Sequence, residues 1–127
     1  MKPNHSFPDI AEFRDAGMDG DSRIFEITQP FRYISSIGLI TVPVGFLTDG
    51  ASVPKVFWNI FQPFGSYFPA ALIHDFLYSK ASRRALTRAE CDRIFHEAMQ
   101  DIGVGWLTRR VIYRAVRIGG KRSFKKR

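Results

Sequence analysis

The pattern of apolar and polar positions divides the chain into a strand-like part and a helical part. Residues 23–48 alternate apolar with polar residues or are rich in β-branched residues, as in "RIFEIT", "FRYIS" and "LITVPVGFLT". Both patterns are typical of strands. Ser35, Ser36 and Gly38 indicate a turn between strands, and Pro43 cannot donate to a β-ladder, so it marks an edge or a break. The pattern predicts a small antiparallel sheet.

From about residue 54 the apolar spacing becomes helical. The pattern predicts a short helix over "VPKVFWNIFQPFG" and a longer one from Pro69 to about Lys80. In "TRAECDRIFHEAMQDIG", Thr87 is followed three residues later by Glu90, which is the capping-box spacing for a helix start. Gly103 follows that helix and favours its termination.

A last helix is predicted over residues 106–118, with an apolar stripe that should face the core. The stripe consists of Leu107, Val111, Ala115 and Val116. Strands followed by helices predict an α+β fold, with a small N-terminal antiparallel sheet followed by three packed helices. We expect a polar, turn-rich arm over residues 1–22, a single domain over 23–120 and a basic tail over 121–127.

Composition agrees with one globular domain, and the charge is unevenly distributed. The chain has 127 residues, of which 45% are apolar and 14% aromatic, and a net charge of +7. Residues 105–127 include no acidic residue, so this basic segment favours contact with an anionic membrane surface, DNA or an acidic protein surface. A solvated helix face is an equal alternative. The basic residues there are Arg109, Arg110, Arg114, Arg117, Lys121, Arg122, Lys125, Lys126 and Arg127.

The sequence disfavours a disulfide-stabilised secreted protein and a membrane-spanning protein. A single cysteine, Cys91, excludes an intrachain disulfide and suits a reducing compartment. The first residues lack the apolar core of a signal peptide, and no apolar run is long enough for a transmembrane helix.

Polar residues interrupt the apolar segment "AALIHDFLYSK". His74 and Tyr78 are four residues apart and share one helix face, whereas Asp75 points about 100° away. Antiparallel packing of the next helix would bring Asp92 toward His74 and Tyr78. An imidazole held by a buried carboxylate is a candidate general base, and a tyrosine hydroxyl can orient that carboxylate. A core histidine bonded to a backbone carbonyl is the alternative.

A second polar cluster, "GFLTDGASVP", directly follows the last predicted strand. Asp49 is a candidate metal ligand there. Alternatively, Asp49 forms an Asx-turn and Gly50 supplies a positive φ. We assign no role to His5 or His96.

Three motifs in order, "GFLTDGASVPKVFW", "AALIHDFLYS" and "TRAECDRIFHEAM", resemble a family of small uncharacterised proteins of tailed bacteriophages and prophages. The resemblance spans residues 31–118 and implies a phage origin. It implies synthesis in the cytoplasm of the bacterial host, with the virion as a further location and other phage structural proteins as partners.

The motif His-Asp-x-x-Tyr followed by a helical Asp is also similar to the phospholipase A2 site, especially the disulfide-free form in parvovirus capsid proteins. This resemblance implies that His74 activates water, that Asp75 binds Ca²⁺, and that Tyr78 and Asp92 orient His74. The glycine-rich calcium loop of those enzymes has no match here.

Two functions are expected before a third, a dedicated nucleic-acid binder, for which the sequence offers a charged end but no recognised module. The first is a phospholipase A2-like hydrolase acting on lipid or envelope esters. The second is a non-enzymatic structural component of the phage virion, in the tail or baseplate, in which the same residues form a buried polar network.

Overall fold

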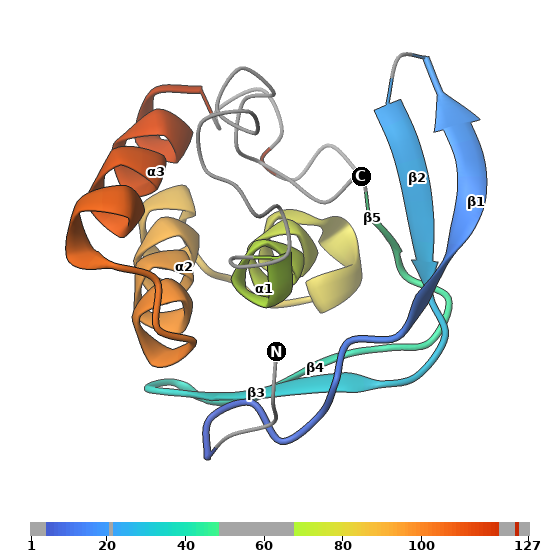
Figure 1. Cartoon of the computed structure of the whole chain (residues 1–127), viewed down its shortest axis with the longest axis horizontal. Helices are drawn as coiled ribbons and strands as arrows, with labels where there is room; N and C mark the ends of the chain where they lie inside the picture. Colours follow the sequence, from blue (N-terminus) through green and yellow to red (C-terminus); the bar gives the residue numbers. More distant parts are fainter. Residues whose placement is uncertain (1–4, 21, 49–67, 120–123, 125–127) are drawn as a thin grey trace.

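The computed structural model describes residues 5–20, 22–48, 68–119 and 124. In these described residues strands come first and three α-helices follow, so the predicted α+β fold is confirmed (Figure 1). The short helix predicted from residue 54 and the polar cluster that contains Asp49 lie outside the described residues.

The strands form two small antiparallel sheets rather than the single sheet that the pattern predicts. The first has the order β1-β2-β5, with β1 over Phe13–Asp19, β2 over Ser22–Ile27 and β5 over Leu47–Thr48. The second is a hairpin of β3, Phe31–Ser35, and β4, Gly38–Val42. The hairpin turn and the end of β4 before Pro43 both lie where the turn residues and the proline predict them.

The predicted N-terminal arm, residues 1–22, contains a strand instead of only loose structure. β1 pairs with β2 and has a bulge between Asp15 and Met18, where Gly17 adopts a φ of +99°. The Asp15 carboxylate accepts a hydrogen bond from the Gly17 backbone N–H. Glycine and aspartate at such a bulge resemble turn residues in sequence, which explains why the pattern predicts a loose arm where the structure has a strand. Phe7 is also fully buried in the core. The domain limits of 23 and 120 stay a prediction.

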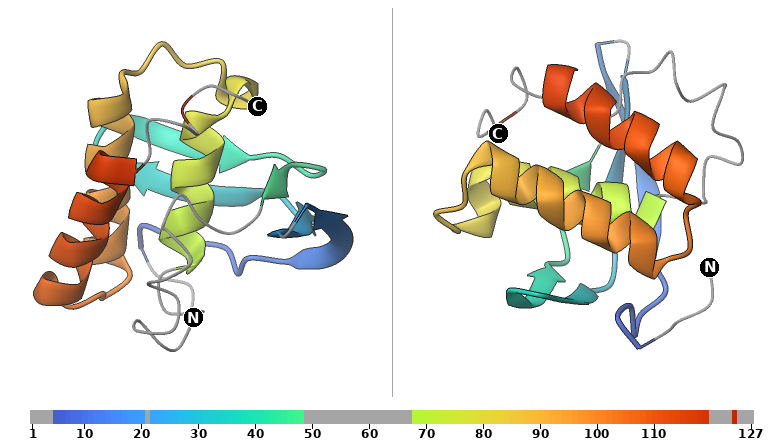
Figure 2. Two further views of the ribbon diagram at one scale, coloured as in Figure 1. Left: turned by 90° about the horizontal axis from the view of Figure 1, so that it is seen from above. Right: turned by 90° about the vertical axis from the view of Figure 1, so that its left-hand side faces the viewer.

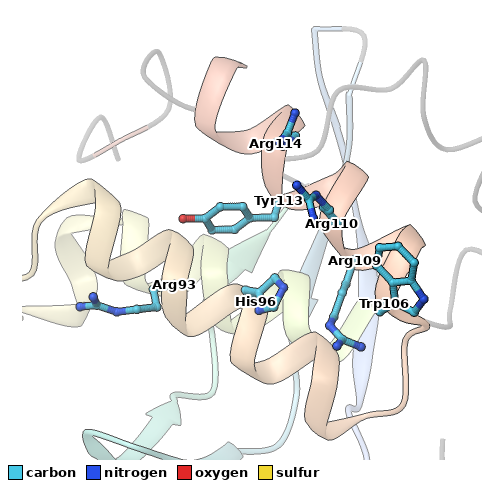
Figure 3. Close-up of a pocket in the computed structure, with 7 residues that line it drawn as sticks. All are labelled: Arg93, His96, Trp106, Arg109, Arg110, Tyr113 and Arg114. Carbon is cyan, nitrogen blue, oxygen red and sulfur yellow. The ribbon is translucent and has the colours of Figure 1, made fainter.

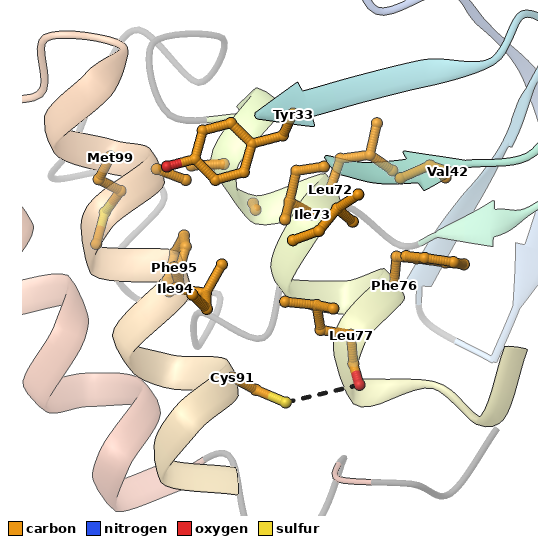
Figure 4. Close-up of a cluster of buried hydrophobic side chains, with 14 of the residues drawn as sticks. Tyr33, Val42, Leu72, Ile73, Phe76, Leu77, Cys91, Ile94, Phe95 and Met99 are labelled. Carbon is orange, nitrogen blue, oxygen red and sulfur yellow. Dashed lines mark hydrogen bonds between the residues drawn. The ribbon is translucent and has the colours of Figure 1, made fainter. Parts of the chain in front are cut away.

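Helix α1, Phe68–Tyr78, occupies the centre of the molecule. The hairpin β3–β4 lies beneath it, β1 and β2 lie on one side, and α2 and α3 lie on the other (Figure 1). Every residue of α1 except Asp75 is buried. Because α1 is enclosed from several directions, its apolar residues surround the helix instead of forming one stripe (Figure 4).

Helix α2, Arg88–Asp101, follows a short 3₁₀ turn at Lys80–Ser82 and packs antiparallel to α1 (Figure 2). Its predicted capping box is present. The Thr87 hydroxyl accepts a hydrogen bond from the Glu90 backbone N–H, and the Glu90 carboxylate accepts one from the Thr87 N–H.

Helix α3, Trp106–Gly119, packs beside α2 (Figure 2). The predicted apolar stripe is correct for Ala115 and Val116 but wrong for Leu107, which is 61% exposed. Ile112 is fully buried instead. Leu107 is five residues from Ile112, about 140° around the helix, so the two cannot share a face.

Thr87→Ala should lower the free energy of unfolding by about 1 kcal/mol, because the side chain that accepts the Glu90 N–H is lost. Urea unfolding of the purified protein measures the change. Thr87→Ser keeps the hydroxyl and should retain most of the stability. Equal losses in both variants would contradict a capping role.

Candidate functional site

Three of the five candidate residues meet between α1 and α2. His74 Nε2 lies 2.6 Å from Asp92 Oδ1, and the Tyr78 hydroxyl donates a hydrogen bond of 2.5 Å to the same oxygen. The helical spacing of His74 and Tyr78 places both on the face of α1 that meets α2. The approach of Asp92 expected from antiparallel packing is therefore present.

The other oxygen of Asp92 binds an arginine that the sequence did not indicate as part of the site. Arg117 Nη1, from α3, lies 2.7 Å from Asp92 Oδ2, and Arg88 Nη1 lies 3.8 Å from it. By sequence, Arg117 belongs to the basic C-terminal segment, whose charges are expected at the surface. Its only signal in the sequence is its position one residue after the buried Val116, near the end of the apolar stripe.

The site is a buried network that connects all three helices. The side chains of His74 and Asp92 are both 0% exposed. The His74 ring stacks on Phe95 with centroids 4.5 Å apart and lies 4.1 Å from the ring of Tyr78. A charge in such a place is tolerated only when its hydrogen bonds are satisfied, and Asp92 has partners on both oxygens.

The environment favours an ionised Asp92 and a neutral His74. Burial alone would raise the pKa of Asp92, but the hydrogen bonds from His74, Tyr78 and Arg117 outweigh it, and the pKa lies below its usual value. Burial lowers the pKa of His74 despite the nearby carboxylate. Burial also raises the pKa of Tyr78, and Asp92 raises it further, so the phenol keeps its proton.

These protonation states fix the tautomer of His74. An ionised carboxylate only accepts hydrogen bonds, so Nε2 must carry the imidazole proton and donate it to Asp92. Nδ1 is then an unprotonated nitrogen with a lone pair. Within the described part of the chain, Nδ1 is buried and has no hydrogen-bond partner. A buried acceptor without a partner is uncommon in proteins and often marks a site for water, a ligand or catalysis.

The proposed calcium site stays a prediction, because only one of its two ligands lies in the described residues. Asp75 is the partly exposed residue of α1, next to His74, whereas Asp49 lies outside the described residues. No group of three metal-binding side chains occurs in residues 5–20, 22–48 and 68–119. Ca²⁺ needs six to eight oxygen ligands, so Asp75 would need several further ligands to hold it.

Comparison with known proteins identifies the family of this chain. Residues 25–116 match the family described as "Protein of unknown function (DUF1353)", and the chain belongs to that family. It is 39% identical over 94 residues to "Uncharacterized protein y4jT" of Sinorhizobium fredii (strain NBRC 101917 / NGR234). The match covers 70% of this chain and 27% of that protein, so the chain spans about a quarter of its curated relative. No solved structure matches.

Within the described part of the chain, no helix is long and apolar enough to cross a membrane.

Asp92→Asn should lower the free energy of unfolding by about 3 kcal/mol at neutral pH, because Arg117 then faces a neutral amide and the hydrogen bonds of His74 and Tyr78 are rearranged. The folded-state pKa of Asp92 lies below the unfolded value of about 3.9. Its ionised form therefore adds stability that is complete above that pH and is lost as the pH falls through the folded pKa.

Urea unfolding at pH 7 and at successively lower pH measures this effect. The difference between the native protein and Asp92→Asn should shrink in acid. Asp19→Asn, at an exposed position of β1, is the matched control and should change the stability little. A constant difference at every pH would show that the charge of Asp92 does not stabilise the fold.

Proposed function

We propose that this chain is a phage-encoded hydrolase of the phospholipase A2 kind, which cleaves an ester of a lipid or another envelope component. The observation that carries the proposal is the arrangement of His74. Asp92 accepts a hydrogen bond from Nε2–H, and the Tyr78 hydroxyl donates to the same carboxylate oxygen. Nδ1 keeps its lone pair and has no hydrogen-bond partner among the described residues. The phage origin rests on the resemblance of the three sequence motifs.

The chemistry follows from this arrangement. His74 Nδ1 removes a proton from a water molecule, whose oxygen attacks the carbonyl carbon of the ester. The imidazole becomes a cation, and the adjacent Asp92 carboxylate stabilises it while Tyr78 and Arg117 keep that carboxylate in place. When the bond to the leaving alcohol breaks, the imidazolium returns the proton to the alcohol oxygen.

The complete burial of His74 adds a condition. Water and an ester reach Nδ1 only in a form of the protein that is more open near α1 than the described one. Such opening is common among enzymes that exclude water until substrate binds. Contact with a lipid surface is a suitable trigger, since the basic residues of α3 favour anionic headgroups by about 1 kcal/mol each.

The same burial supports a second function, a non-enzymatic structural component of a phage virion. Asp92 connects α1, α2 and α3 through His74, Tyr78 and Arg117, and the side chains of His74 and Asp92 have no exposed surface. A satisfied polar network of this kind can fix one arrangement of helices in a protein that must assemble with others. The unbonded Nδ1 is the feature that this second function does not require.

His74→Ala should reduce ester hydrolysis at least about a hundredfold, because the base is lost. The assay measures fatty acid released from phosphatidylglycerol vesicles by the full chain, with added calcium and with a chelator. Tyr78→Phe keeps the base and loses one bond to Asp92, so its activity should fall less. His5→Ala, at an exposed position, is the matched control and should keep full activity.

Circular dichroism and urea unfolding accompany each variant, so that loss of activity is separated from loss of fold. Hydrolysis that is equal in the native protein and a folded His74→Ala variant would contradict the proposed base. A folded native protein that releases no fatty acid with or without calcium, and that is strongly destabilised by His74→Ala, would favour the structural function.

A further inference from the structure

A second feature, separate from the buried network, is a hollow on the outer side of α2 and α3. It has a volume of about 450 Å³, within the range of small-molecule sites. Arg93 and His96 line it from α2, and the remaining residues come from one face of α3 (Figure 3). The α3 residues are Trp106, Arg109, Arg110, Tyr113 and Arg114.

The charge of this hollow has one sign. Four of its lining residues are arginines and none is acidic. Within the described part of the chain, none of the four arginines forms a salt bridge, in contrast to Arg88 and Arg117 on the inner side of the same helices. Guanidinium groups that line one hollow without a salt bridge attract an anion, and phosphate is an anion whose oxygens suit the planar donors of arginine (Figure 3).

One arginine has a donor that the protein itself does not use. Arg109 Nη1 donates to the Val104 carbonyl oxygen at 3.0 Å, which fixes the guanidinium at the start of α3. Its Nε–H is buried and has no partner among the described residues. A buried donor without a partner is costly, and an oxygen of a bound ligand would satisfy it once the Arg109 side chain shifts enough to admit that oxygen. Burial and the charge of Arg109 also lower the pKa of His96.

Aromatic rings complete the lining. The Tyr113 ring lies over α2 and meets the His96 ring edge-on, with centroids 5.4 Å apart (Figure 3). Trp106 is 63% exposed at the end of the hollow near Arg109. A large exposed indole beside guanidinium groups is a common platform for stacking a planar ring, as in proteins that bind nucleotides or single strands.

We propose that the hollow lined by α2 and α3 binds a small phosphate ester that carries a planar ring, such as a nucleoside phosphate. The arginines hold the phosphate, Arg109 supplies the unused donor, and Trp106 stacks on the ring. The source of the ligand is a free nucleotide or the terminal nucleotide of a single strand, which present the same chemistry. This site does not depend on His74, so it stands or falls separately from the proposed hydrolysis.

Calorimetric titration of the full chain with AMP, adenosine and inorganic phosphate tests the proposal. AMP should bind at least about tenfold more tightly than either adenosine or phosphate, because only AMP engages both the arginines and the indole. Arg110→Gln combined with Arg114→Gln should weaken AMP binding about tenfold or more, and both positions are exposed, so the fold is retained. Trp106→Ala should weaken it about tenfold.

The matched control is Arg14→Gln combined with Arg23→Gln, which removes the same charge from β1 and β2 and should leave AMP binding unchanged. A terminally phosphorylated oligonucleotide that competes with AMP would identify a strand end as a source, and a lack of competition would leave the free nucleotide. Equal weakening by the control pair, or no saturable AMP binding, would overturn the proposal. So would binding to phosphatidylglycerol vesicles through Arg110 and Arg114 without binding of AMP.

Discussion

The carboxylate of Asp92 is the group on which the arrangement of the three helices depends. It lies where a charge is unfavourable, and it is tolerated because α1 provides His74 and Tyr78 while α3 provides Arg117. Each partner reaches Asp92 only if its helix has the correct rotation and register. The carboxylate therefore selects one packing of α1, α2 and α3 from the many that an apolar interface of Leu, Ile and Phe would allow.

This constraint also determines which chemistry the site can perform. Because the Nε2–H donates a hydrogen bond to an ionised carboxylate, the imidazole has one unprotonated nitrogen of fixed orientation, which is the requirement for a general base. Fixing the helices alone does not need such a nitrogen, because the bonds of Tyr78 and Arg117 to Asp92 already join α1, α2 and α3. The unbonded Nδ1 of His74 is therefore a feature that the proposed hydrolysis uses and that a purely structural network does not require.

Local signals in the sequence predicted more of the fold than long-range ones did. The capping box at Thr87, the hairpin turn before Gly38 and the end of β4 before Pro43 depend on neighbouring residues, and all three are present. The pattern did not indicate strand β1, because Asp15 and Gly17 form a bulge and resemble turn residues in sequence. The contact between His74 and Asp92 was predictable because a short linker makes two helices antiparallel. Arg117 was not, because its partner depends on how α3 packs.

The arginines of α3 show how one residue type serves two environments on opposite sides of a helix. Arg117 points inward and is neutralised by Asp92, whereas Arg110 and Arg114 have no acidic partner within the described residues and border the outer hollow. A guanidinium keeps its charge in both places, and its planar donors suit a carboxylate as well as a phosphate. Within α3, the basic character that the sequence indicates therefore divides into a charge neutralised by Asp92 and charges without an acidic partner among the described residues.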